Sequence, residues 1–206
     1  MNIQVLEREL RYRMHIPYQW NARQGDATDA QTNFIYRCTT FDQVHRQASA
    51  CFGEASERYH YALNRWFNFI SAQAVEYFFT RHPRVRPEPN TRHQSIDFYL
   101  DGIPFDHKTT VWPRGYPGTF DDAVLNPQGL ALWLYRNQST QRRYHTANRI
   151  FLVLFADDHQ HWRLKADLSL LATRIEEYLD AFTPAQLITV PVPGSPQADV
   201  IFVTDW

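Results

Sequence analysis

Residues Ser95–Thr110 read S-I-D-F-Y-L-D-G-I-P-F-D-H-K-T-T, and the organisation of the chain is predicted outward from this stretch. An Asp-Gly pair between two apolar runs is a strong signal for a two-residue β-hairpin, because both turn positions need a positive φ angle. A turn at residues 101–102 pairs Phe98 with Phe105. Side chains alternate between the faces of a strand, so the apolar residues of the hairpin share one face with His107.

The other face of the hairpin is polar and carries Asp97, Asp106 and Lys108. The same register places Asp97 opposite Asp106, with Cβ atoms roughly 5 Å apart, where like charges destabilise a sheet. A divalent cation would remove this repulsion, because Mg²⁺ binds hard oxygen ligands and commonly takes one or two carboxylates, completed by water and phosphate oxygens. The pattern predicts a Mg²⁺ (or Mn²⁺) site, with Lys108 placed to steady an attacking water or a phosphate. The alternative is a half-exposed hairpin with a solvated polar face.

The order of Asp97 and then Asp106-His107-Lys108 on the next strand resembles the signature of the PD-(D/E)XK nuclease superfamily. Ile96 stands where that family often has proline. The resemblance implies that Asp97 and Asp106 bind the metal, helped by the backbone carbonyl of His107, and that Lys108 assists the attack. It also implies an α/β (α+β) protein with a restriction-endonuclease-like αβββαβ core, in which helices flank a mixed central sheet.

In that family an extra glutamate often comes from the helix before the catalytic strands. Residues 53–58, G-E-A-S-E-R, resemble the G-x-x-x-E-R opening of the resolvase-type members and favour Glu57. Glu76 is the alternative, because it is closer in sequence to Asp97. On a single helix over 54–80, at about 1.5 Å per residue, the two lie nearly 30 Å apart, so at most one serves the site.

Arginines concentrate on both sides of the hairpin. Positive charge beside a metal-carboxylate site would hold the backbone of a polyanion. We therefore expect nucleic-acid contacts from Arg84, Arg86 and Arg92 before the hairpin, and from Arg142 and Arg143 after it. The alternative for these residues is a pair of arginine-rich loops exposed to solvent.

The sequence predicts an N-terminal appendage over 1–40 and a nuclease-like domain over 41–206. The appendage contains a helical segment, a polar loop at 21–32 and a short strand at 34–36. The elements predicted for the domain are helices over 41–51 and 54–80 separated by Gly53, an extended arm over 82–93, a helix starting at Asn126-Pro127, a buried strand over 150–155, a return strand over 161–165, and a C-terminal extension formed by one helix and strands over 187–192 and 199–204.

Composition limits the classes of protein that the chain can represent. A formal net charge of -1 argues against a generally basic nucleic-acid coat but leaves room for a local patch. Cys38 and Cys51 have no framework spacing and are expected to be free thiols of a reducing compartment. Neither a signal-peptide pattern nor an apolar run of about 20 residues is present, so a cytoplasmic protein without a membrane partner is expected.

Together these features predict a metal-dependent nuclease, with a DNA endonuclease as the expected activity and a homodimer as a plausible assembly for cutting two strands. The competing hypothesis is a non-catalytic module on the same fold that binds nucleic acid or another protein, which the near-neutral charge favours. A hydrolase of unrelated fold would require the predicted hairpin register to be wrong.

Overall fold

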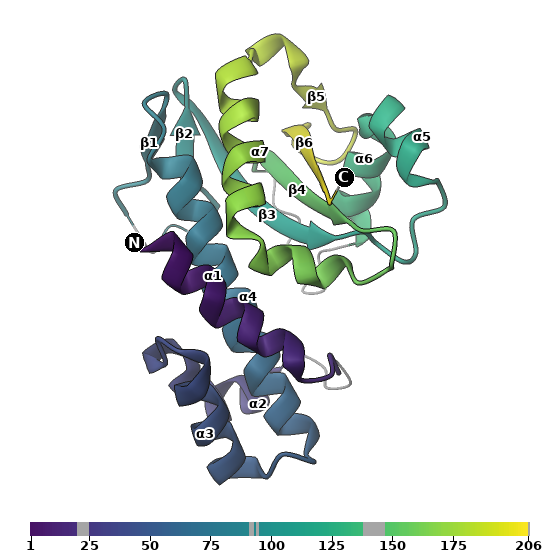
Figure 1. The fold of residues 1–206 in the computed structure, drawn as a ribbon. Helices are drawn as coiled ribbons and strands as arrows, with labels where there is room; N and C mark the ends of the chain where they lie inside the picture. Colours follow the sequence, from purple (N-terminus) through teal and green to yellow (C-terminus); the bar gives the residue numbers. More distant parts are fainter. Residues whose placement is uncertain (20–24, 91–92, 94, 138–146, 206) are drawn as a thin grey trace. The chain divides into compact units, whose positions relative to one another are not determined.

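A computed structural model describes residues 1–19, 25–90, 93, 95–137 and 147–205 (Figure 1). The chain divides into two compact units, of which the first comprises Met1–Ala74 with Lys165–Ser169, and the second comprises Val75–Leu164 with Leu170–Trp206. The division therefore falls inside a helix and not at residue 40, where the sequence predicts a boundary.

The first unit is helical. Its elements are α1 (Ile3–Tyr12), the 3-10 helices η1 (Arg13–His15) and η2 (Asn33–Arg37), α2 (Asp26–Gln31), α3 (Phe41–Phe52) and residues 57–74 of α4 (Glu57–Thr80). The predicted break between two helices is confirmed, since Gly53 ends α3 with a φ of 75°. The strand predicted at 34–36 is wrong: the segment is a 3-10 turn that buries Ile35 and leaves Tyr36 exposed. The loop predicted at 21–32 contains α2, while residues 20–24 lie outside the described part of the chain.

Residues beyond position 40 belong to the same unit as the N-terminal segment because buried polar contacts join them. The Glu9 carboxylate accepts a hydrogen bond from the backbone N–H of Phe41 (2.9 Å), which starts α3. The indole of Trp66 on α4 donates to the backbone carbonyl of Cys38 (2.8 Å). Both Glu9 and Trp66 are buried, so these bonds are made without competition from water. They link segments on the two sides of residue 40, and the predicted domain boundary stays a prediction.

Lys165 belongs to the first unit and makes two hydrogen bonds to residues of α4. Its ammonium donates to Asn68 Oδ1 (2.7 Å), and its carbonyl accepts a hydrogen bond from the Ser71 hydroxyl (3.0 Å). Asn68 is neutral, so this contact does not compensate the charge. Burial accordingly lowers the pKa of Lys165 from its ordinary value of 10.5 to about 8.

Replacing Lys165 by methionine is expected to stabilise the protein at pH 7 by about 1–2 kcal/mol, because it removes the cost of burying a charge. The free energy of unfolding of the native protein should rise as the pH climbs from about 8 to 10.5, since the unfolded chain still binds a proton that the folded chain has released. The variant should lack this rise. Urea denaturation across this pH range measures both effects, and a variant that is less stable than the native protein at pH 7 would contradict the prediction.

The second unit contains a mixed six-stranded sheet with the order β1-β2-β3-β4-β6-β5. Its strands are β1 (Val85–Pro87), β2 (Phe98–Leu100), β3 (Ile103–Val111), β4 (Arg149–Phe155), β5 (Ile188–Thr189) and β6 (Gln197–Thr204). β4 pairs in parallel with both β3 and β6, and the remaining pairs are antiparallel. The predicted α/β class with a mixed sheet is thereby confirmed.

Helices cover both faces of this sheet (Figure 1). α6 (Pro127–Asn137), preceded by the short α5 (Phe120–Leu125), packs on one face through a cluster that includes Leu130, Leu134, Phe151 and Val153. The end of α4 and α7 (Leu168–Ala181) lie on the other face. The 3-10 helix η4 (Pro184–Gln186) follows α7 in the chain. Phe79 stacks on Phe98 at 4.8 Å between ring centroids, and Phe182 meets Phe105 edge-on at 6.4 Å.

The hairpin at residues 98–105 has the predicted register. Asp101 and Gly102 have φ angles of 49° and 85°, as a two-residue turn requires. Phe98 pairs with Phe105, as expected from the turn position. The sequence signal was strong because the turn residues and the apolar alternation specify the same pairing.

The return strand predicted at 161–165 is wrong, because this segment belongs to the 3-10 helix η3 (His161–Ala166). β3 and β6 occupy both edges of β4, so a strand returning directly after β4 would have no free edge to pair with. The chain turns away at Ala156, whose backbone N–H donates to Nδ1 of His161 (2.8 Å).

Candidate active site

Asp106 lies near the start of β3, and only 5% of its surface is exposed. Lys108 Nζ contacts Asp106 Oδ1 at 2.7 Å, as expected for two residues of one strand that face the same side. Arg149 Nε contacts the other oxygen, Oδ2, at 2.9 Å. One carboxylate is therefore held by two cationic side chains.

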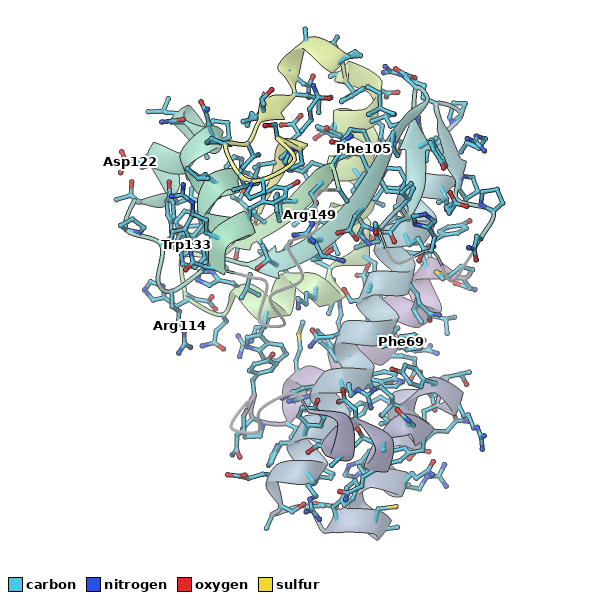
Figure 2. All side chains as sticks on the ribbon, turned by 180° about the vertical axis from the view of Figure 1, so that it is seen from behind. Phe69, Phe105, Arg114, Asp122, Trp133 and Arg149 are labelled. Carbon is cyan, nitrogen blue, oxygen red and sulfur yellow. The ribbon has the colours of Figure 1, made fainter. Side chains whose placement is uncertain are left out.

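Arg149 is the residue of this cluster that the sequence did not single out. It is the first residue of β4 and the register partner of Asp106 in the parallel pair. Only 5% of the surface of Arg149 is exposed. Its guanidinium lies 5.2 Å from the centre of the Tyr135 ring. Arg149 is labelled in Figure 2. A charged residue directly before the apolar run I-F-L-V-L-F was the available signal, because a charge at the start of a buried strand needs a partner.

Tyr135 fixes the far side of this arginine. Burial raises the pKa of its hydroxyl well above the ordinary range, although the Arg149 charge opposes the shift. The hydroxyl therefore stays protonated and donates to the backbone carbonyl of Ala147 (2.9 Å). Arg149 is thus confined between a carboxylate and an aromatic ring.

Asn148 positions the start of β3 beside β4. Its backbone carbonyl accepts the N–H of Asp106 (3.0 Å), and its side-chain amide donates to the carbonyl of Pro104 (3.2 Å). Its Oδ1 accepts the N–H of Gln197, at the start of β6 (2.9 Å). These three bonds hold the beginnings of three strands together and set the position of the Asp106 backbone.

The sequence predicts Asp97 directly opposite Asp106, and this prediction is wrong. The ladder ends at Phe98 and Phe105, and the N–H of Asp97 donates to the carbonyl of Phe105 (2.8 Å), so that two residues of one strand lie against one of the other. This is the arrangement of a β-bulge, which re-aims the side chain of the extra residue. Asp97 Oδ2 accepts the backbone N–H of His107 and contacts Nδ1 of its ring, each at 2.8 Å.

The environment of Asp97 keeps its carboxylate charged. Burial alone would raise its pKa, but the hydrogen bonds and charge of His107, together with the charge of Lys108, outweigh it and lower the pKa. Because a carboxylate only accepts hydrogen bonds, Nδ1 of His107 carries the proton in this pair. The ring packs against Phe79 and Phe98, on the apolar face to which the sequence assigned it.

The two candidate glutamates have different positions. Glu76 is exposed near the end of α4 and belongs to the second unit, with Asp97 and Asp106. Glu57 is the first residue of α4 and belongs to the first unit. In the described part of the chain no group of three or more His, Cys, Asp or Glu side chains is arranged to hold a metal ion. A role for either glutamate stays a prediction.

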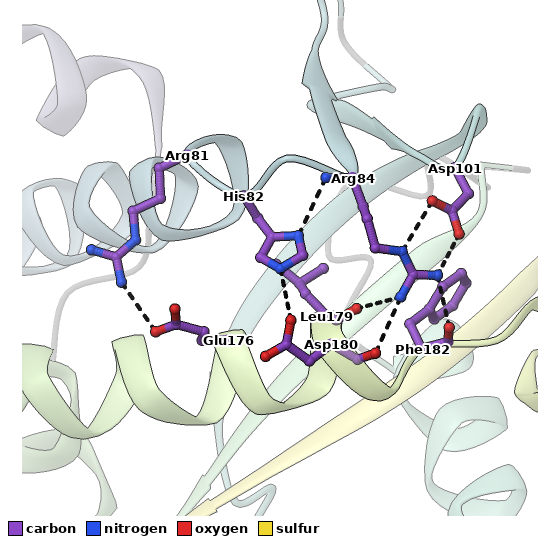
Figure 3. Close-up of polar contacts among 8 residues, drawn as sticks. All are labelled: Arg81, His82, Arg84, Asp101, Glu176, Leu179, Asp180 and Phe182. Carbon is purple, nitrogen blue, oxygen red and sulfur yellow. Dashed lines mark hydrogen bonds and ion pairs between the residues drawn. The ribbon is translucent and has the colours of Figure 1, made fainter.

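Arg84, expected to contact nucleic acid, makes several contacts within the protein (Figure 3). It forms two contacts with the Asp101 carboxylate and donates to the carbonyls of Leu179 (2.6 Å) and Phe182 (2.8 Å) at the end of α7. Carbonyls at a helix C-terminus attract cations, so this arginine caps α7. The predicted phosphate contact would have to break these bonds.

The other predicted nucleic-acid contacts are less constrained. Arg86 is exposed and lies 4.3 Å from the centre of the Tyr99 ring. Arg92, Arg142 and Arg143 lie outside the described residues. A pocket of about 220 Å³ adjoins the start of β3 and is lined by His93, Ser95, Ile96, Pro104, Ala147 and Asn148.

Comparison with protein-family models, with curated proteins and with solved structures found no match. No helix of the described residues is long and apolar enough to cross a membrane.

Proposed function

We propose that this protein is a metal-dependent nuclease that hydrolyses phosphodiester bonds, with DNA as the expected substrate. The observation that carries the proposal is the contact between Asp106 and Lys108 on β3, together with the ionised Asp97 directly before β2. Two carboxylates and a lysine in this order and on adjoining strands are the elements of the PD-(D/E)XK signature.

The arrangement of the second unit supports the same proposal. The chain order α4, β1, β2, β3, α5, α6, β4 follows an αβββαβ order with the short α5 as an additional helix, and the antiparallel hairpin is followed by a strand parallel to β3. A helix-containing connection between parallel strands is the usual way to build such a pair. We propose on this basis that the fold is restriction-endonuclease-like, extended by α7, β5 and β6.

The amino-acid usage of the chain supports a specific role for Lys108. Nineteen of the 21 basic residues are arginine, and only Lys108 and Lys165 are lysine. Arginine is thus the chain's ordinary surface cation. A lysine beside Asp106 supplies a compact charge with a flexible stem, which suits contact with a nucleophile or a phosphate oxygen better than a planar guanidinium does.

Both carboxylates keep lone-pair positions that their contacts within the protein leave for a divalent cation. A carboxylate offers about four lone-pair positions, and the contacts of Asp106 use one on each oxygen, while both contacts of Asp97 are at Oδ2. Mg²⁺ needs only one or two carboxylates when phosphate and water complete its shell. Asp97, Asp106 and the His107 carbonyl would hold the ion. When bound, the ion supplies a stronger water nucleophile and neutralises charge on the phosphate.

The side chains of the site then have separable roles. Asp106 would hold the cation next to Lys108. Lys108, half of whose side chain is exposed (49%), can leave Asp106 and donate to the attacking water or to a phosphate oxygen. Asp97 orients the backbone N–H and ring of His107, which fixes the strand next to Asp106.

A non-catalytic binding module on the same fold is the second candidate. One observation favours it: both oxygens of Asp106 are already bound by cations of the chain. Such a protein would bind nucleic acid or another protein without cleaving it.

A cleavage assay separates the two candidates. The native protein is incubated with plasmid, linear duplex, single-stranded DNA and RNA, each with Mg²⁺, with Mn²⁺ or with EDTA. We expect cleavage of at least one DNA substrate that depends on the added metal. Binding without cleavage of all four polymers would favour the binding module, and cleavage undiminished by EDTA would contradict the metal-dependent mechanism.

A further inference from the structure

Arg149 and Lys108 hold the same carboxylate but differ in how firmly they are placed. Lys108 has 49% of its side chain exposed, so its ammonium can move into solvent or to a substrate. The side chain of Arg149 is 7% exposed and is confined by Tyr135. When a cation approaches Asp106, Lys108 can withdraw but Arg149 cannot.

The charges around Asp106 determine how tightly a divalent cation would bind there. Asp97 and Asp106 contribute two negative charges, and Lys108 and Arg149 contribute two positive charges within contact distance of Asp106. Charges in a poorly solvated site interact more strongly than charges in water, so a divalent ion would be repelled by the buried arginine. A phosphate group adds negative charge and would restore the balance.

We propose that Arg149 is the internal counter-ion of the Asp106 site: it neutralises Asp106 while no metal is bound, weakens the binding of free metal, and thereby makes metal bind more tightly when a phosphate-bearing substrate is present. This inference rests on the proposed nuclease function and adds a form of regulation to the same site. Arg149 is a positioning residue here, since it acts through Asp106 and not on the substrate.

The test is a calorimetric titration of the full chain with Mn²⁺ alone. Arg149→Gln removes the buried charge and is expected to bind Mn²⁺ at least about ten-fold more tightly than the native protein. Arg149→Lys keeps the charge and should bind within about three-fold of native affinity. Arg163→Gln is the matched control, because it removes an arginine of the same unit whose ion pair, with Asp158, lies elsewhere.

Circular dichroism melting without metal accompanies the titration and identifies variants that fail to fold. If Arg149→Gln is unfolded, Arg149→Met takes its place, since an unbranched apolar side chain suits the space against Tyr135. A folded variant with native or weaker Mn²⁺ affinity, while Asp106→Asn abolishes binding, would overturn the counter-ion role and leave the metal site standing. Absence of Mn²⁺ binding in the native protein and in every Arg149 variant would overturn both proposals.

Discussion

Lys108→Ala is expected to lower the rate of nucleic-acid cleavage by about 1,000-fold while leaving the protein as stable as the native form. The stability is unaffected because Lys108 is half exposed and its bond to Asp106 is a partly solvated ion pair, which contributes about 0–1 kcal/mol. Asp106 keeps its contact with Arg149 in this variant. Single-turnover cleavage and thermal melting measure the two effects.

Two further variants make this result specific. Lys108→Arg should restore little activity, because a planar guanidinium does not occupy the position of a compact ammonium. Arg163→Ala is matched in exposure, with 50% of its side chain accessible, and should cleave at the native rate. Equal cleavage by native protein and Lys108→Ala would remove Lys108 from the mechanism.

Asp106→Leu is expected to abolish cleavage and to destabilise the protein by about 3–5 kcal/mol, because it leaves Arg149 buried without a carboxylate. Adding Arg149→Met removes the stranded charge. Replacing both members of a buried pair by apolar residues is often neutral, so the double variant should recover stability to within about 1 kcal/mol of native. Its cleavage activity should stay undetectable.

The test is a double-mutant cycle of four proteins: the native protein, Asp106→Leu, Arg149→Met and the double variant. Urea denaturation and the cleavage rate are measured for each of them. Recovery of stability without activity separates the structural role of Asp106 from its chemical role. A double variant as unstable as Asp106→Leu would mean that the pair with Arg149 does not account for the loss. Recovered cleavage would show that Asp106 is not required for the reaction.

The hairpin could be predicted because its information is local. Turn residues at 101–102 and the apolar alternation around them specify one register, and that register is observed. The bulge at Asp97 could not be predicted, because it depends on which carbonyl accepts one backbone N–H at the open end of the ladder. A change of one residue in that pairing moved the Asp97 carboxylate from Asp106 to His107.

The contacts of Arg149 and Arg84 were not predicted from the sequence because their partners are distant along the chain. Arg149 lies 43 positions from Asp106, and their contact follows only from the parallel register of β3 and β4. Arg84 finds its carbonyl partners 95 and 98 positions away, at the end of α7. A cluster of arginines in the sequence predicts a nucleic-acid-binding surface. Contacts between distant parts of the chain determine which of these arginines are hydrogen-bonded within the protein.

The most direct test of the central claim is a calorimetric Mn²⁺ titration of the native protein beside Asp106→Asn, a substitution that keeps the side-chain shape and removes the charge. We predict saturable Mn²⁺ binding to the native protein and a loss of at least about ten-fold in affinity in the variant, because a carboxylate ligand becomes a neutral amide. Equal Mn²⁺ affinity of the two proteins would contradict the assignment of Asp106 as the metal-binding carboxylate.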